Sequence, residues 1–214
     1  MRVQTRLVLV RHGHARASLD GVVGGARGCR GLTGDGVRQA TALRDRLAAT
    51  GEVRADVLLT STLPRAIETA DVIAPAIGAF ATRAADCDLC ELHPGECDGM
   101  TWAEYGEKYA FDMRAEPDRP LSPGGESLRS FQARVTRAVA AIVEQYDGAS
   151  VVVVSHGGFI SGACHALLGT PGMGDTRAFR LEPENTSLTE WHREDDGQWV
   201  LERYNDAAHL QSHG

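Results

Sequence analysis

Three short apolar runs constrain the fold of this chain more than any other feature of its sequence. They are LVLV at residues 7–10, VLL at 57–59 and VVVV at 151–154. Unbroken aliphatic runs of this length are typical of strands with two buried faces, as in a parallel sheet. The sequence therefore predicts a sheet whose central strands are covered on both sides.

Segments with helical periodicity lie between these runs and would supply the covering layers. The segment 32–50 has apolar residues at helical spacing, namely Val37, Ala40, Leu43 and Leu47. The segment 125–146 carries a longer apolar stripe, formed by Leu128, Phe131, Val135, Val139, Ile142 and Val143. A further helix is expected over 158–169.

Local signals mark where two of the predicted helices begin. In the segment 61–78, Thr62 can cap a helix and Pro64 suits its first turn. Thr101 and Glu104 have the spacing of a capping box.

Strands and helices alternate through most of the chain, and the stretches SLTEWH and QWVLERY predict further strands near its end. This order predicts an α/β fold, a three-layer α/β/α sandwich around a mostly parallel central sheet. We expect a single domain over residues 1–214, since this length suits one sizeable core. The loop-rich residues 84–125 are expected to form a small cap over the site.

Composition and charge exclude several classes of partner. The net charge is −7 and no basic run stands out, so we expect no nucleic-acid partner. No apolar run approaches the roughly 20 residues of a membrane helix, and Leu7–Val10 is too short for a signal peptide. We therefore expect a cytoplasmic protein without a membrane partner. Five cysteines, an odd number, argue against a disulfide framework.

Polar residues follow the three buried runs. The first run leads into Arg11 and His12, the second into Ser61 and Arg65, and the third into His156. Ligands of open α/β sheets bind beyond the carboxyl ends of the strands. If these strands are neighbours, two arginines and two histidines therefore converge on one spot.

Such a cluster suits a phosphoryl group. Arginine forks match phosphate oxygens, and phosphoryl transfer needs mainly positioning and charge stabilisation. Neutral imidazole is a fair nucleophile near pH 7 because the free side chain has a pKa of about 6.5. The leaving alkoxide needs a proton, and Glu91 is the candidate acid.

Five stretches of the sequence, in order, resemble motifs of the histidine phosphatase superfamily, which includes phosphoglycerate mutases and many small-molecule phosphatases. The resemblance extends over nearly the whole chain, to RYNDAAHL at its end. The stretches are LVLVRHGHARAS, LLTSTLPRAIETA, LCELHPGECDG, SPGGESLRSFQARV and VVVVSHGGFISG.

The resemblance implies roles for five residues. His12 is expected to be the nucleophile that becomes phosphohistidine. Arg11, Arg65 and His156 would form the rest of the phosphate pocket. Glu91 would protonate the leaving group and then activate water.

The resemblance also points to substrate-binding positions, with two departures from the family pattern. Gly157 would offer a backbone N–H, and Gly24 and Gly25 lie where the family has a loop that contacts substrate. Ser18 takes the place of the usual phosphate-binding Asn and stays a candidate because serine can still donate a hydrogen bond. His14 replaces the usual Glu or Gln, and we expect it to contribute to specificity together with residues 92–125.

A cysteine and histidine cluster overlaps the segment that carries Glu91. Cys87, Cys90, His93 and Cys97 follow the pattern C-x2-C-x2-H-x3-C, which could bind zinc. The spacing of the later pairs is tighter than in common zinc modules. We therefore predict reduced thiols, no metal site and no cofactor.

The favoured function is hydrolysis of a small phosphorylated metabolite by a metal-independent phosphatase, acting as a monomer or homodimer. A phosphoglycerate mutase is the alternative, but roughly thirty residues remain for a lid between Glu91 and His156, fewer than such a mutase is expected to need. A non-catalytic binding protein is a third hypothesis. It has no need of the whole set of Arg11, His12, Arg65, Glu91 and His156.

Overall fold

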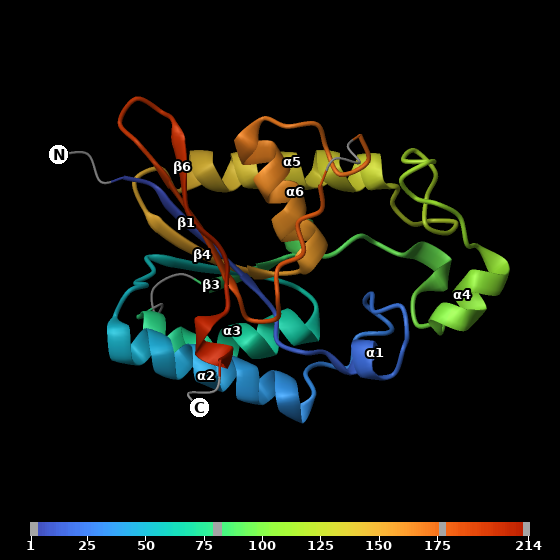
Figure 1. The fold of residues 1–214 in the computed structure, drawn as a ribbon, viewed down its shortest axis with the longest axis horizontal. Coiled ribbons are helices and arrows are strands. Elements are labelled where there is room, and N and C mark those ends of the chain that lie inside the picture. The colour runs from blue at the N-terminus through green and yellow to red at the C-terminus, as the bar shows by residue number, and fades with distance from the viewer. Residues whose placement is uncertain (1–3, 79–82, 176–178, 212–214) are drawn as a thin grey trace.

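A six-stranded sheet organises the protein (Figure 1). The computed structural model describes residues 4–78, 83–175 and 179–211. The strands are β1 (Arg6–Arg11), β2 (Val57–Ser61), β3 (Arg83–Asp86), β4 (Ser150–Ser155), β5 (Leu188–Arg193) and β6 (Trp199–Asp206). The helices are α1 (Arg16–Leu19), α2 (Gly34–Thr50), α3 (Pro64–Ile77), α4 (Trp102–Lys108), α5 (Leu128–Gln145) and α6 (Gly157–Leu168). Single 3-10 turns are η1 (Cys87–Leu89), η2 (Gly95–Cys97) and η3 (Ala208–Leu210).

The strand order is β3-β2-β4-β1-β5-β6. β1, β2, β3 and β4 pair in parallel, whereas β5 is antiparallel to β1 and β6 is antiparallel to β5. In the register of β1 and β4, Arg11 lies opposite Ser155. The mostly parallel sheet and both strands near the chain end are confirmed.

Helices cover both faces of the sheet. Alternate residues of β1 point to opposite sides, so that Leu7 and Leu9 pack toward α5 and α6 while Val8 and Val10 pack toward α2 and α3. Figure 1 shows the two helix pairs on opposite sides of the strands. The predicted three-layer architecture is therefore confirmed.

Two local predictions are wrong and two are confirmed, one of them the place of Pro64 in the first turn of α3. Val37 is 46% exposed on the outer side of α2 and is not part of the core. The N-cap of α3 is Leu63, and Thr62 does not cap the helix because its hydroxyl lies 3.1 Å from Cys90 Sγ instead. The capping box of Thr101 and Glu104 is present at the start of α4.

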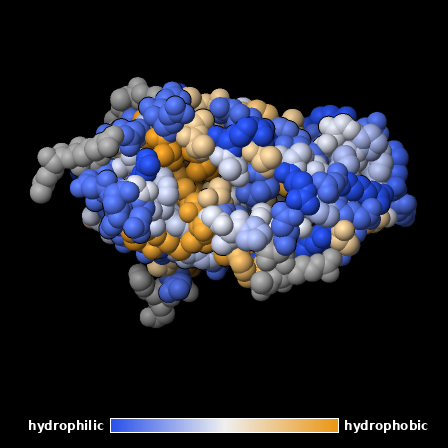
Figure 2. Space-filling model, turned by 90° about the horizontal axis from the view of Figure 1, so that it is seen from above, coloured by the Kyte–Doolittle hydropathy of each residue, from blue (hydrophilic) through white to orange (hydrophobic). Residues whose placement is uncertain are grey.

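The segment from β3 to α5 contains little regular structure besides the short α4. It has its own small apolar cluster, in which Tyr105 and Leu121 pack with Val23 and Cys97. Figure 1 shows α4 at one end of the molecule, away from the main helix layers, and on the face drawn in Figure 2 that end is mainly hydrophilic. Within the described residues, no helix is long and apolar enough to cross a membrane.

Candidate active site

The carboxyl ends of β1, β2 and β4 bring the predicted cationic residues together. His12 follows β1, and its backbone N–H donates to the carbonyl of Ser155 at 2.9 Å. His156 follows β4, and its ring centroid lies 5.0 Å from that of His12. Arg65 reaches both rings from the first turn of α3, because its Nε lies 3.0 Å from His12 Nε2 and 3.2 Å from His156 Nδ1.

The contacts of His12 define its protonation state. Nδ1 lies 2.7 Å from the carbonyl oxygen of Gly13 and therefore carries the ring proton. Nε2 is therefore unprotonated, and its single lone pair accepts from Arg65 Nε at 3.0 Å. Burial, followed by the charge of Arg65, lowers the pKa of His12 well below its usual value. His12 is thus a neutral imidazole, and its Nε2 lone pair becomes available to an electrophile once Arg65 releases this hydrogen bond.

Buried contacts fix the backbone around His12. The carbonyl of His12 accepts from Asn185 Nδ2 at 2.8 Å, and the N–H of Gly13 donates to Thr69 Oγ1 at 3.0 Å. A side chain at Gly13 would place its Cβ 2.5 Å from the carbonyl oxygen of Gly36, so the close packing of this turn against α2 requires glycine. The sequence indicated neither Asn185 nor Thr69.

His156 is fully buried and belongs to a relay of hydrogen bonds. Its Nδ1 accepts from Arg65, so Nε2 carries the proton and donates to Ser61 Oγ at 2.7 Å. The Ser61 oxygen also accepts from the N–H of Leu63 at 3.1 Å, so its own hydrogen is left for Cys90 Sγ, 3.3 Å away. Burial, followed by the charge of Arg65, lowers the pKa of His156 well below its usual value.

Both arginines retain donors for an anion. Arg65 Nη1 donates to the carbonyl of Gly24 at 2.7 Å, and Arg11 Nη1 donates to that of Pro183 at 2.6 Å. Arg11 Nε is buried and has no partner among the described residues. Burial lowers the pKa of Arg11, although the carboxylate of Glu91 opposes this. In the described part of the chain, neither guanidinium lies within 4.0 Å of a carboxylate, and Glu91 acts on Arg11 only from farther away. Two arginines therefore face one carboxylate in this cavity.

The carboxylate of Glu91 is held at the start of α6. Oε2 accepts from the N–H of Gly158 at 2.9 Å, and Oε1 accepts from the N–H of Leu92 at 3.2 Å. A Cβ at Gly158 would lie 2.2 Å from Oε1, so this approach requires glycine.

Arg134 positions the segment that carries Glu91. Its Nη1 donates to the carbonyls of Asp88 at 2.8 Å and Cys90 at 3.1 Å, and its Nη2 donates to that of Glu91 at 3.2 Å. Glu126 accepts a two-pronged ion pair from the same guanidinium, at 2.7 and 2.8 Å. The motif SPGGESLRSFQARV contains Glu126 and Arg134, but the sequence does not indicate that they hold the segment that carries Glu91.

Two cavities meet at Arg11 and Glu91. His12, Arg65, Ser18, Gly24 and Gly25 line the first, of about 380 Å³, together with Arg11 and Glu91. Gly157 lines the second, of about 420 Å³, together with Arg114, Arg180 and the same shared pair. Three of the four predicted substrate-binding residues therefore lie with His12, and Gly157 lies on the other side of Arg11.

His14 lies outside the first cavity, so its predicted role in specificity at this cavity is wrong. Its Nδ1 lies 3.0 Å from Thr33 Oγ1, and its side chain lines a separate depression that includes Asp35 and His209. The turn after His12 directs side chain 14 toward α2 rather than toward the ligand.

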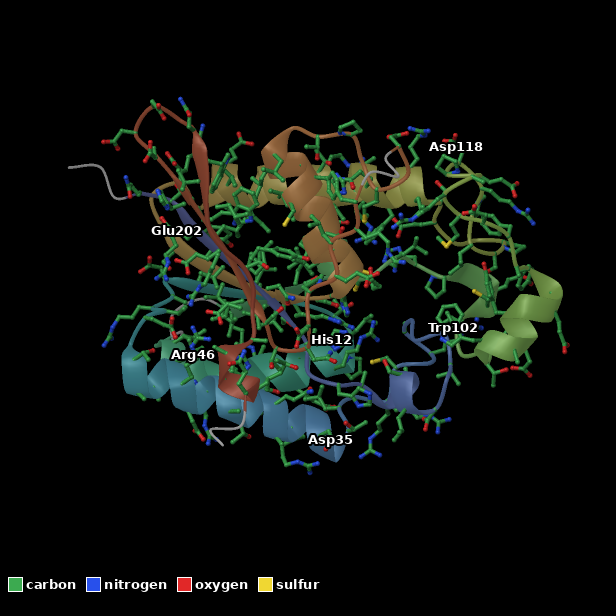
Figure 3. The ribbon with its side chains drawn as sticks, in the orientation of Figure 1. His12, Asp35, Arg46, Trp102, Asp118 and Glu202 are labelled. Carbon is green, nitrogen blue, oxygen red and sulfur yellow. The ribbon has the colours of Figure 1, made fainter. Side chains whose placement is uncertain are left out.

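The wall opposite the histidines is apolar. Figure 3 shows Trp102 beside α4 and His12 at the strand ends. The Trp102 and Tyr105 rings pack edge to face, with centroids 5.6 Å apart. The apolar residues that line this cavity are Ala15, Ala17, Val22, Val23, Leu92, Pro94, Trp102, Tyr105, Met113 and Leu121. No periodic pattern in residues 92–125 indicated which side chains would face inward.

The structure brings together three of the four residues of the cysteine and histidine pattern. The ligand atoms of Cys87, Cys90 and His93 lie within 4.8 Å of one another. Cys97 is separate, because it is buried under α4 and its Sγ donates to the carbonyl of Pro94 at 3.2 Å.

Comparisons with known proteins agree with this arrangement. The family described as the histidine phosphatase superfamily (branch 1) matches residues 7–207. The chain belongs to this superfamily, and the resemblance seen in its motifs is confirmed.

Relatives and a solved structure match over most of the chain. A metal-independent phosphoserine phosphatase of Arabidopsis thaliana is 30% identical, covering 98% of this chain and 85% of that protein. Phosphoglycerate mutase-like protein 4 of the same plant is 29% identical, covering 97% and 88%. The solved structure of Bacillus stearothermophilus YhfR superposes with a TM-score of 0.81 at 29% identity, covering 97% of this chain and 100% of that one.

Proposed function

We propose that the protein hydrolyses a phosphate monoester in two steps through a phosphohistidine at His12. The observation that carries this proposal is the lone pair of Nε2, beside two arginines that have no carboxylate partner. When the ester binds, Arg65 Nε transfers its hydrogen bond from Nε2 to a phosphate oxygen. Nε2 then forms a bond to phosphorus while the bond from phosphorus to the leaving oxygen breaks. The guanidinium groups of Arg11 and Arg65 bind the equatorial oxygens, where charge is spread in the transition state.

Glu91 handles the protons of both steps. In the first, its carboxylic acid form gives a proton to the leaving oxygen. In the second, the carboxylate accepts a proton from the attacking water, the N–P bond breaks and inorganic phosphate leaves. Its position at the edge of both cavities supports this role, since the leaving group and the water both approach there.

His156 supports the phosphate from the side. A bound dianion stabilises the imidazolium form, in which Nδ1–H donates to a phosphate oxygen while Nε2–H still donates to Ser61. Gly157 and Ser18 stay candidates for further donors, from the α6 N-terminus and from the cavity rim respectively. Residues 84–125 act as the cap that supplies the apolar wall.

The lining of the first cavity favours a substrate with an uncharged, largely apolar leaving group. Among the described residues that line it, the only cationic side chains are Arg11 and Arg65, and the phosphate uses both. A phosphoglycerate whose carboxylate stays within this cavity would place it against Trp102, Met113 or Leu121 without a partner, at a desolvation cost. Arg114 and Arg180 line the second cavity, on the other side of Arg11. The lining therefore supports a phosphatase rather than a phosphoglycerate mutase.

One assay separates these two activities. The enzyme is given 3-phosphoglycerate with a trace of 2,3-bisphosphoglycerate, and both 2-phosphoglycerate and inorganic phosphate are followed. We expect release of phosphate without a bisphosphate primer, inhibited competitively by vanadate. Isomer formation much faster than phosphate release overturns the proposal. A parallel panel of phosphate monoesters should show higher kcat/KM for aryl and alkyl esters than for carboxylate-bearing ones.

A further inference from the structure

We propose that Cys87, Cys90 and His93 bind one thiophilic divalent cation of the zinc class, at a site separate from the phosphate pocket. Their two sulfurs and one ring nitrogen lie within 4.8 Å of one another, and Cys87 Sγ is 3.4 Å from His93 Nε2. Ligands around tetrahedral zinc lie roughly 3.5–3.8 Å apart, given bonds of about 2.3 Å to sulfur and 2.0 Å to nitrogen. Side-chain movements of about 1 Å are therefore sufficient to close the site.

The local backbone already holds the two thiols on one side. Cys87 begins the turn η1 and Cys90 follows it, with the N–H of Cys90 donating to the carbonyl of Cys87 at 3.0 Å. Arg134 fixes the same turn through the carbonyls of Asp88 and Cys90. Only side-chain rotations need to change when an ion binds.

His93 is oriented toward the sulfurs by a carboxylate. Its backbone N–H donates to Glu126 Oε2 at 2.8 Å, and its Nδ1 lies 3.7 Å from the same oxygen. Nε2 is therefore the ring nitrogen on the side of Cys87. A carboxylate behind a histidine ring is the usual support for a metal-ligating imidazole.

The charge and openness of the cluster suit a zinc-class ion. Two thiols lose their protons to solvent on binding, and two thiolates neutralise a divalent cation. The Thr62 and Ser61 hydroxyls, 3.1 and 3.3 Å from Cys90 Sγ, can donate to that thiolate. Cys90 is 2% exposed whereas Cys87 is exposed, so an ion can reach the cluster from solvent and water can serve as its fourth ligand.

The site also connects to the phosphate pocket through Ser61. A metal-bound thiolate at Cys90 attracts the Ser61 hydrogen more strongly than a thiol does, and this makes the Ser61 oxygen a better acceptor for His156 Nε2–H. The cation should thus favour the imidazolium of His156 and tighten anion binding. This coupling rests on the proposed role of His156, whereas the binding of the ion does not.

Cobalt titration tests the site directly. Reduced protein, stripped with a chelator and kept under an inert atmosphere, is titrated with Co²⁺. We expect one equivalent per chain, with thiolate-to-cobalt charge transfer, tetrahedral visible bands and displacement by Zn²⁺. Absence of the thiolate band, or a chain whose mass is lower by two hydrogens because Cys87 and Cys90 form a disulfide instead, overturns the proposal.

Variants separate these ligands from the rest of the sequence pattern. Cys87→Ser and His93→Gln should each weaken Co²⁺ binding, and Cys87→Ser should also reduce the charge-transfer band. Cys97→Ala and His192→Gln are the controls and should bind cobalt like wild type, because neither residue belongs to the cluster. Circular dichroism confirms that each variant is folded. Equal weakening in Cys97→Ala overturns the assignment of ligands.

Vanadate inhibition tests the coupling. One equivalent of Zn²⁺ should lower the inhibition constant for vanadate roughly threefold to tenfold, the effect of about one hydrogen bond. By linkage, vanadate should tighten Co²⁺ binding by the same factor. Ser61→Ala should still bind one Co²⁺ but lose the effect. A cation effect of unchanged size in Ser61→Ala or in Cys87→Ser overturns the coupling, whereas the cobalt titration alone decides the metal site. If vanadate inhibits the metal-free enzyme too weakly to be measured, that result counts against the proposed function instead.

Discussion

The phosphate pocket and the apolar wall opposite it are built in different ways. In the pocket, His12, Arg65 and His156 each stand at a strand end or on the first helical turn beyond one, and each makes hydrogen bonds in the buried interior. In the wall, Trp102 belongs to the seven-residue helix α4 and Met113 lies in a loop. The rigid, buried pocket should therefore govern the chemical step, whereas the wall should govern which ester is bound.

The largest effect should come from the nucleophile. His12→Ala should lower kcat by ~10⁴-fold or more, because no other group can form the covalent intermediate. Rapid quenching of the wild type should trap a phosphoenzyme that is labile in acid and stable in base. The matched control is His192→Ala on β5, which should keep full activity because its ring pairs with Glu202 outside the pocket. Sizeable turnover by a folded His12→Ala protein, or an acid-stable phosphoenzyme, sinks the assignment.

The next effect tests Glu91, which lies where pocket and wall meet. Glu91→Gln should slow alkyl phosphates by about 10²–10⁴-fold and nitrophenyl phosphate much less, because the nitrophenolate leaves without a proton. The measurement is the ratio of kcat/KM for the two esters. Equal losses on both would mean that Glu91 only positions other groups or that phosphoenzyme breakdown limits the rate.

The wall should give a smaller, selective effect. Trp102→Ala should lower kcat/KM for an aryl phosphate by about tenfold through KM, with kcat nearly unchanged, because it removes apolar contact with the leaving group. Glycerol phosphate should be affected much less. Leu19→Ala is the control, since Leu19 is similarly exposed but does not line the cavity. A loss in kcat, or the same loss for both esters, contradicts the division between pocket and wall.

The sequence could predict the pocket because its residues follow from local pattern and sheet topology. Runs such as VVVV require buried strands, and a parallel sheet directs the residues after them to one edge. Arg11 and His156 were therefore expected to meet from strands that are distant in the chain but adjacent in the sheet. Glu91 was different, because the motif resemblance and not the periodicity placed it there.

The wall could not be predicted because irregular segments have no repeating pattern. Tyr105 and Leu121 face inward only because the loops around α4 fold back on Val23. The same reason explains the error at His14, whose direction depends on the tight turn at Gly13 packed against α2. The relay through Ser61 depends on a contact with Cys90 from another segment, which no single stretch of sequence reveals.

The smallest effect concerns the pH dependence of stability and again separates the two regions. The pKa values of His12 and His156 are lowered in the folded protein, so below the ordinary value of about 6.5 the unfolded chain binds more protons than the native one. The free energy of unfolding should therefore be unaffected by these two histidines above about pH 6.5. Below that pH it should fall, by at most about 1.4 kcal/mol per pH unit for each histidine.

Urea unfolding between pH 7.5 and 5.0, in a buffer without phosphate, measures this loss. His165 and His209 also have lowered pKa values and add to the slope of the wild type, so the informative quantity is the difference between variants. His12→Ala should show a shallower fall in the free energy of unfolding than the wild type, because one buried neutral histidine is gone. Trp102→Ala, in the wall, is the control and should leave the slope unchanged because it removes no titratable group. If His12→Ala has the slope of the wild type, His12 is not held neutral by its surroundings, and the lone pair on which the proposed attack depends is not available below neutral pH.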